Sequence, residues 1–190
     1  MKINIKTLEI AGLASTLQAL RLPFSKECRS KIKITNHFNS LVDDLELKSW
    51  RFESSGIINE KDLQLMSTLV KRGDEHAKAL RGIVVYASIE APIWFYRELE
   101  TYRIGRERLS SESTMHVECK GLSGEELETA KNNIPMGHIQ KTVDLFSYPT
   151  LRRIYKQRHN HRLPMWHDFC AWIESLPFFD TIIMPDKENM

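Results

Sequence analysis

The chain has 190 residues, of which 42% are hydrophobic and 27% are charged, and its formal net charge at pH 7 is +2. This length and composition suit one globular domain with a real core, and the net charge is too small to argue by itself for a nucleic-acid or an acidic partner. Three widely spaced cysteines (Cys28, Cys119 and Cys170) exclude a disulfide framework and a Cys-x-x-Cys metal site, and they fit a reducing cytosol.

The beginning of the chain, Met1–Lys6, lacks the apolar core of a signal peptide. No apolar run approaches the roughly 18 residues of a membrane-spanning helix. We therefore expect a soluble, cytoplasmic protein.

In the first half of the chain, hydrophobic periodicity and turn residues predict two strands and two helices. In chain order these are a strand over Ile3–Ile10 with a defect in its alternation, a helix over Ala11–Leu22, a helix from the N-cap Asn59 to Arg72, and a buried strand over Ile83–Ile89. Pro23 and Gly73 end the two helices. Residues 24–56 show no clear pattern and are expected to hold short strands at most.

The second half is predicted to alternate helices with fewer strands. The expected order is a helix from Pro92 to Tyr102, an irregular polar segment over Gly105–Thr114, a strand through Val117, a helix from the capping box Ser123–Glu126 to Asn133, a strand over Ile139–Phe146, a helix over Pro149–Arg158, and a last helix from Pro164 to near Pro177. Without a regular βαβ rhythm, this order indicates an α+β domain. We expect one domain over residues 1–184 and a charged tail over residues 185–190.

Two charged residues fall on the apolar faces of predicted helices. Glu98 lies on the stripe formed by Phe95 and Tyr102, and Arg158 continues the line of Ile154. A charge on an apolar face is costly unless it is paired or meets a ligand. The two residues therefore either pair with each other or with neighbours, or line a pocket for a polar, anionic molecule.

The common phosphate, dinucleotide and hydrolase motifs are absent, because the sequence contains no P-loop, GxGxxG, GxSxG or HExxH. Histidines cluster within residues 159–167 without a regular ligand spacing, so a polar loop is favoured over a metal site. In the basic run Leu151–Arg162, only Arg158 and Arg162 project with the apolar side, which makes them the better ligand candidates. Ser110–His116 is either a plain turn or a substrate-binding loop.

Several segments carry a likeness to a known family in their order and spacing. They are Leu65–Gly73 with Asp74-Glu-His76, the strand Ile83–Ile89, the helix Ala91-Pro-Ile-Trp-Phe-Tyr-Arg-Glu-Leu-Glu-Thr-Tyr-Arg-Ile-Gly105, Ala130-Lys-Asn-Asn-Ile-Pro135 and Leu151–Trp166. From about Leu63 to Ile173 this series resembles the core of flavin-dependent thymidylate synthases. That family has a "PIFVARQ-x-x-RHR" helix, then "S-x-NE-x-S-x-RY", "AR-x-x-LP" and "SL-x-x-F-x-x-R".

The resemblance implies a small, mostly antiparallel sheet packed with helices, and a homotetramer whose sites lie between subunits. It also implies a methyltransferase activity in which a folate-borne one-carbon unit is joined to the pyrimidine nucleotide dUMP and reduced with FAD. Residue by residue, it implies substrate contacts for Glu98, Arg103, Thr114, His116, Lys131 and Arg158. It implies cofactor contacts for Arg103, Ile104 and Arg162.

The chain also departs from the family pattern. Thr101-Tyr102-Arg103 stands where the family has "RHR", and Gly73–Ala79 differs from the family's "GHE-T/S-P-x-E" flavin segment. Two functions therefore stay open: an enzyme of this type, and a catalytically inactive protein that binds or sequesters a nucleotide on the same fold. A nucleic-acid-binding protein that uses Arg152–Arg162 is the third alternative.

Overall fold

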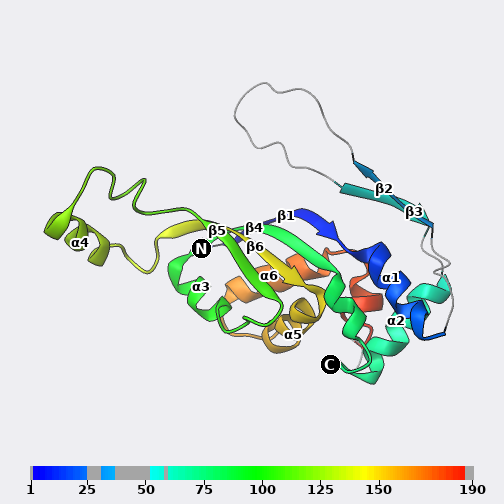
Figure 1. The fold of residues 1–190 in the computed structure, drawn as a ribbon. Coiled ribbons are helices and arrows are strands. Elements are labelled where there is room, and N and C mark those ends of the chain that lie inside the picture. The colour runs from blue at the N-terminus through cyan, green and yellow to red at the C-terminus, as the bar shows by residue number, and fades with distance from the viewer. Residues whose placement is uncertain (1, 25–30, 37–51, 58–59, 187–190) are drawn as a thin grey trace.

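A computed structural model describes residues 2–24, 31–36, 52–57 and 60–186 of the chain. It confirms the predicted α+β class. Its larger sheet is antiparallel and has the strand order β1-β4-β6-β5 (Figure 1). These strands are β1 (Asn4–Ala11), β4 (Val84–Pro92), β5 (Arg106–Ser111) and β6 (Ile139–Ser147). A separate antiparallel pair is formed by β2 (Lys31–Asn36) and β3 (Phe52–Ile57).

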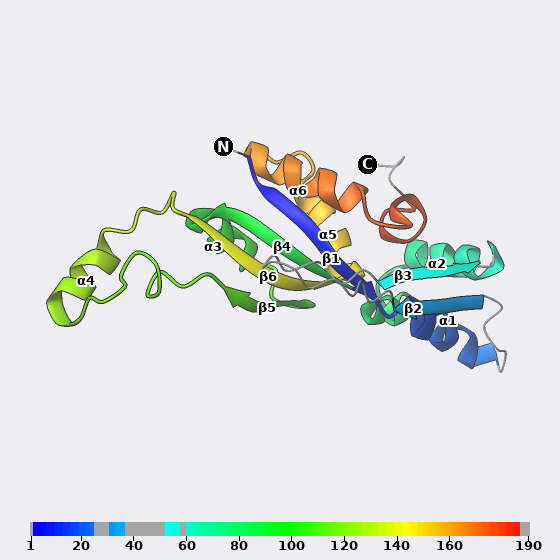
Figure 2. The same cartoon turned by 90° about the horizontal axis from the view of Figure 1, so that it is seen from above.

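Some of the helices cover one face of the larger sheet. The helices are α1 (Leu13–Arg21), α2 (Glu60–Arg72), α3 (Ile93–Leu99), α4 (Gly124–Asn132), α5 (Tyr148–Arg158) and α6 (Pro164–Glu174), with the short turns η1 (Leu22–Phe24), η2 (Lys78–Gly82) and η3 (Phe179–Ile183). Figures 1 and 2 show α3, α5 and α6 on the same side of the sheet. In the described part of the chain, every helix is too short or too polar to cross a bilayer.

The core lies between this sheet face and these helices. Aromatic rings from three elements meet there: Phe95 of α3 lies with its ring centroid 4.8 Å from that of Trp166, and Phe146 of β6 lies 5.9 Å from Phe169. All four side chains are fully buried. Aromatic pairs at these distances add to the stabilisation that burial itself provides. The core thereby fixes α3 and α6 against β6.

The predicted elements of the first half are largely confirmed. The defect in the alternation of the first strand is a register shift between Thr7 and Glu9 where β1 pairs with β4. Gly73 adopts φ +119° directly after α2, which agrees with its predicted role as a helix end. The N-cap predicted at Asn59 lies outside the described residues, as do much of 24–56 and the tail from residue 187.

Two predictions between α3 and α4 are wrong. The segment predicted to be irregular contains β5, and the strand predicted through Val117 is a series of turns instead. β5 forms because it pairs with β6, where the Arg106 side chain is buried against the Asp144 carboxylate. This ion pair joins distant parts of the sequence, so local polarity gave no sign of it. Val117 is 70% exposed and lies in a turn, and it takes part in none of the strand pairs of the described residues.

Two helices differ from the prediction, one in where it ends and one in its capping contact. α3 ends at Leu99 rather than at Tyr102, although Tyr102 is buried as predicted. α4 begins after Ser123, but the Ser123 side chain makes no capping hydrogen bond. The capping box therefore marked the position of the helix start without forming the expected contact.

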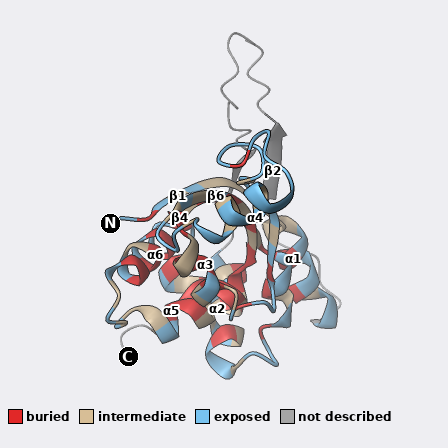
Figure 3. Cartoon of the chain, turned by 90° about the vertical axis from the view of Figure 1, so that its left-hand side faces the viewer, coloured by how far each residue is buried: buried red, intermediate tan, exposed pale blue. Residues whose placement is uncertain are grey.

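Residues 112–138 form an arm that extends away from the body of the molecule (Figure 1). Its helix α4 has no buried residue, and Figure 3 shows it as an exposed element. The chain leaves and returns at neighbouring points, because the Glu112 amide donates to the Lys141 carbonyl at 2.8 Å. On its return, the arm contacts the start of α3: the Ile93 and Trp94 amides donate to the carbonyls of His138 and Met136, each at 3.0 Å.

Candidate functional site

The two charges that helical periodicity placed on apolar faces pair with each other. Arg158 Nη1 lies 3.6 Å from Glu98 Oε2, and the same oxygen accepts a hydrogen bond from the Trp166 indole at 2.8 Å. The side chains of Arg158 and Glu98 are 19% and 33% exposed. Of the two alternatives left open by the sequence, these contacts favour pairing.

Aromatic rings complete the surroundings of Arg158. Its guanidinium carbon lies 4.6 Å from the Trp166 ring centroid and 5.6 Å from that of Tyr102. Its Nε donates to the Tyr102 hydroxyl at 2.8 Å, and that hydroxyl donates to Gln157 Oε1 at 2.9 Å. Arg158 is therefore engaged by an ion pair, a hydrogen bond and two rings, and it stabilises the contact between α3, α5 and α6.

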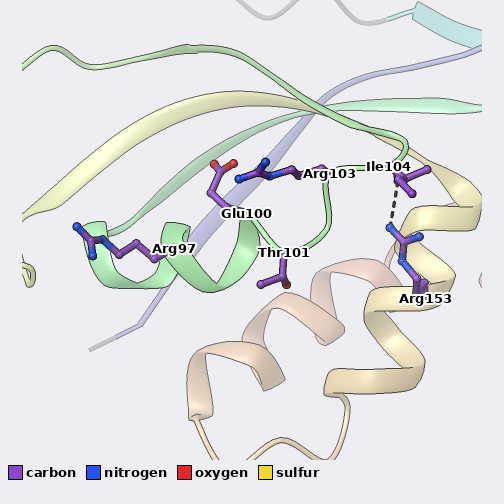
Figure 4. Close-up of a pocket in the computed structure, with 6 residues that line it drawn as sticks. All are labelled: Arg97, Glu100, Thr101, Arg103, Ile104 and Arg153. Atoms are coloured by element: carbon purple, nitrogen blue, oxygen red, sulfur yellow. Dashed lines mark hydrogen bonds between the residues drawn. The ribbon is translucent and has the colours of Figure 1, made fainter.

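An open pocket of about 510 Å³ lies at the C-terminal end of α3. Its walls come from α3, from the turn that follows α3, and from α5 (Figure 4). The lining residues are Arg97, Glu100, Thr101, Arg103, Ile104 and Arg153. Two of the predicted ligand contacts, Arg103 and Ile104, are in this set, whereas Glu98 and Arg158 are not.

The turn that carries Arg103 and Ile104 is held by α5. The Ile104 carbonyl accepts hydrogen bonds from Thr150 Oγ1 at 2.7 Å and from Arg153 Nη2 at 3.1 Å. Gly105 adopts φ +77°, and a Cβ at this position would overlap with the Thr150 hydroxyl. Glycine is needed here for both reasons. The turn therefore has a defined position relative to α5.

The pocket is rich in positive charge. Arg97 and Arg103 are exposed, and in the described ranges neither side chain makes a hydrogen bond or ion pair with another residue. Arg153 adds a third guanidinium, and Glu100 contributes the one carboxylate among the lining residues. Guanidinium groups bind phosphate and carboxylate through paired, charge-assisted hydrogen bonds. This arrangement suits an anionic ligand.

A buried charge cluster that the sequence analysis missed lies under Glu100. Arg106 pairs with Asp144, whose side chain is fully buried, and Arg108 Nε lies 3.8 Å from the same carboxylate. Both arginines also contact Glu100 Oε1, Arg108 at 2.8 Å and Arg106 at 3.3 Å. The Thr142 hydroxyl donates to the second oxygen of Asp144. The alternating positions 106 and 108, and 142 and 144, were the available signal, because residues two apart share one face of a strand.

A buried tyrosine borders this cluster. The Arg108 guanidinium carbon lies 4.8 Å from the Tyr96 ring centroid. The Tyr96 hydroxyl lies 2.7 Å from the Ile89 carbonyl and 2.8 Å from the Gln140 carbonyl. Burial raises the pKa of Tyr96 to about 12, so it stays a neutral hydrogen-bond donor.

The remaining predicted site residues lie elsewhere. On the arm, Lys131 donates to the Thr114 hydroxyl, and His116 is exposed. Arg162 is exposed in the turn before α6. Figure 1 shows the arm far from the end of α3. Within one copy of the chain, the predicted residues thus fall into an ion pair, a pocket and an arm, with Arg162 apart from all three.

Much of the basic run on α5 is paired within the chain. Arg152 donates to the Ile183 carbonyl at 2.7 Å and to Asp186 at 3.1 Å, and Lys156 contacts the same carboxylate at 3.2 Å. Although partial burial acts to raise the pKa of Asp186, the hydrogen bonds and charges of Arg152 and Lys156 lower it below its usual value. These pairs reduce the charge that the run offers to a nucleic acid.

Comparison with solved structures identifies proteins of the same fold. A crystal structure of the flavin-dependent thymidylate synthase ThyX from Helicobacter pylori, complexed with FAD and dUMP, superimposes with a TM-score of 0.64 and 14% sequence identity, and covers 98% of this chain and 99% of that one. A second ThyX structure from Helicobacter pylori with FAD and dUMP gives a TM-score of 0.65 at 13% identity, with 97% and 98% coverage. No protein-family model matches the sequence. No curated protein matches it either.

Proposed function

We propose that the protein binds a pyrimidine nucleotide or a related phosphorylated molecule in the pocket at the end of α3. The observation that carries this proposal is the group of three arginines, Arg97, Arg103 and Arg153, around one open pocket. The fold shared with ThyX, which is complexed with FAD and dUMP in the structures above, supports the same ligand class. Since the sequence identity is low, the shared fold alone does not define the ligand.

The pocket residues fit the anionic part of a flavin dinucleotide. When this cofactor rather than a mononucleotide occupies the pocket, Arg97, Arg103 and Arg153 would hold its phosphates, and Ile104 would contact an apolar part of it. A bound flavin would supply the hydride that reduces a one-carbon unit on dUMP. With it, the protein would be a methyltransferase of the thymidylate synthase type.

A specific observation favours the alternative without catalysis. Tyr102, which stands at the histidine of the family's "RHR", is buried, and its hydroxyl is engaged by Arg158 and Gln157. It is therefore not free to contact a flavin. A protein that binds or sequesters a nucleotide needs the arginines of the pocket but not this contact.

Thermal unfolding in the presence of ligands tests nucleotide binding. At about one hundred times the dissociation constant, a ligand that binds only the folded state stabilises it by about 2.7 kcal/mol, so dUMP or FAD should raise the melting temperature. Arg103→Ala and Arg153→Ala should weaken binding about 10- to 100-fold, since each removes charge-assisted hydrogen bonds. Arg81→Ala, at an exposed arginine outside the pocket, is the matched control. No response to either ligand, or equal behaviour of all three variants, would contradict the proposal.

A direct assay separates the enzyme from the binding protein. Purified protein is supplied with dUMP, a folate-borne methylene donor and reduced FAD, and dTMP is measured by mass spectrometry. Formation of dTMP that is lost in Arg103→Ala supports the enzyme. A dUMP-dependent rise in melting temperature without dTMP supports nucleotide binding alone.

We further propose that the arm joins copies of the chain into a homo-oligomer, a tetramer by resemblance. Large hydrophobic side chains are exposed along the arm and at its base, namely Met115, Val117, Leu122, Met136 and Ile139. Exposed apolar groups of this kind are typical of a surface that packs against another chain. In such an assembly, Thr114, His116 and Lys131 would reach a ligand in the pocket of a neighbouring subunit.

Native mass spectrometry tests the assembly. Val117 is 70% exposed, and Val117→Asp should convert the oligomer into smaller species because it introduces a charge into an apolar contact. Leu22→Asp changes a side chain that is 64% exposed on η1, away from the arm, and should leave the subunit number unchanged. A monomeric parent protein would rule out the proposed assembly.

A further inference from the structure

The two oxygens of the Glu100 carboxylate differ in their contacts with the protein. Both of its arginine contacts go to Oε1, from Arg108 Nη2 at 2.8 Å and from Arg106 Nη1 at 3.3 Å. Within the described ranges, the only hydrogen bond to the Glu100 side chain goes to Oε1, from Arg106, and none goes to Oε2. The side chain is 41% exposed, and it lines the pocket. One oxygen is therefore held by the protein, and the other remains available as an acceptor.

The two arginines that hold Oε1 are themselves fixed from the opposite side. Arg106 pairs with the fully buried Asp144, and its own side chain is 3% exposed. Arg108 approaches Asp144 and lies over the Tyr96 ring. Because guanidinium groups in such contacts have little freedom, the orientation of the Glu100 carboxylate is set before any ligand arrives.

A carboxylate in an arginine-lined pocket affects ligands in opposite ways. It repels a bare anion, and so reduces the attraction that the three arginines create. It favours a ligand that places a hydroxyl or N–H group next to its anionic group, because that group can donate to Oε2. Specificity arises when one feature disfavours the competitor and favours the correct ligand.

We propose that Glu100 is a specificity residue that restricts this pocket to phosphorylated ligands with a hydrogen-bond donor beside the phosphate, such as a nucleoside phosphate, and discriminates against inorganic anions. This inference rests on the proposed nucleotide binding and adds a selection rule to it. Arg97, Arg103 and Arg153 attract the anion, and Glu100 selects among anions by their donors.

Glu100→Gln tests the rule sharply because the amide is held in one orientation. Arginines are donors only, so Arg106 and Arg108 hold the glutamine carbonyl oxygen at the position of Oε1. The amide NH₂ then takes the position of Oε2, and the pocket presents a donor where it had an acceptor. The substitution should therefore weaken binding of dUMP about tenfold, yet strengthen binding of sulfate, an inorganic anion that carries no donor. A general loss of structure would weaken both.

The measurement is isothermal titration calorimetry of the full chain with dUMP and with sulfate at pH 8. Glu107→Gln, which makes the same charge change at the exposed neighbour Glu107 on β5, is the control and should alter either affinity by less than about twofold. Glu100→Asp keeps a carboxylate and should still prefer dUMP over sulfate. If the parent protein binds no dUMP, the proposed function fails and this inference fails with it. If the parent binds dUMP but Glu100→Gln shifts both ligands in the same direction, or neither, only the selection rule is overturned.

Discussion

Replacing Asp144 by alanine should be among the most damaging single changes in the sheet. The Asp144 side chain is fully buried, and its partner Arg106 is 3% exposed. Alanine at position 144 leaves the Arg106 guanidinium in the core. The carboxylate that remains beside it is that of Glu100, 3.3 Å away and 41% exposed.

The expected loss follows from this geometry. Removal of one partner of a buried ion pair destabilises a protein by about 3–5 kcal/mol, because an uncompensated charge stays behind. The remaining contact with Glu100 places the value for Asp144→Ala near the lower limit, at about 3 kcal/mol. For a chain of this length, that corresponds to a fall in melting temperature of about 6–12 °C.

Urea unfolding followed by circular dichroism measures this loss. The control is Glu90→Gln, which breaks the pair of Glu90 with Lys141 at 3.3 Å on the same sheet, where the side chains are 40% and 50% exposed. The control should cost less than about 1 kcal/mol, as exposed pairs do. The double variant Asp144→Leu with Arg106→Met should recover most of the stability, since it leaves no buried charge. An Asp144→Ala midpoint equal to that of the control, or a double variant less stable than Asp144→Ala, would refute the reasoning.

Three further predictions concern other side chains. Tyr102→Phe removes the hydroxyl that accepts from Arg158, and should lower the free energy of unfolding by about 1–2 kcal/mol in urea, whereas an unchanged midpoint would contradict this role. Because Arg152 helps to hold the pKa of Asp186 below its usual value, the parent should be more stable than Asp186→Asn at neutral pH, and this difference should shrink as the pH falls below about 4 and vanish below the lowered pKa. A difference that is independent of pH would show that the charge of Asp186 is not responsible. Burial raises the pKa of Cys170 to about 12, so peptide mapping at pH 8 should find it unlabelled by a thiol reagent in the native protein and labelled in urea; rapid native labelling would contradict its burial.

Local patterns were sufficient to predict most of the helices and strands. The period of apolar residues identified α5 and α6, and it placed Glu98 and Arg158 on the inner faces of their helices. That prediction depends only on the backbone geometry of a helix. What the two charges meet depends on the indole of Trp166, which comes from a third helix, so pairing and ligand binding could not be separated from the sequence.

The part of the site that was missed is non-local. Arg106 and Arg108 looked like members of an exposed polar segment, because their partner Asp144 is 36 or more residues away along the chain. Once Asp144 is buried beside them, the same residues form a strand and support Glu100. The pocket could not be predicted for a similar reason. Arg97 and Arg153 are ordinary surface residues on their own helices, and only the packing of α3 against α5 brings them together.

The hydrogen bonds between the returning arm and α3 link two regions that are otherwise far apart. The first two amide groups of α3, at Ile93 and Trp94, have no partner within the helix, and the carbonyls of His138 and Met136 satisfy them. The same short helix carries Arg97, and Glu100 follows directly at its other end. A neighbouring chain that binds the arm would therefore change how the start of that helix is held. Ligand affinity would then depend on the number of chains in the assembly. By linkage, the ligand would have an equal effect on assembly.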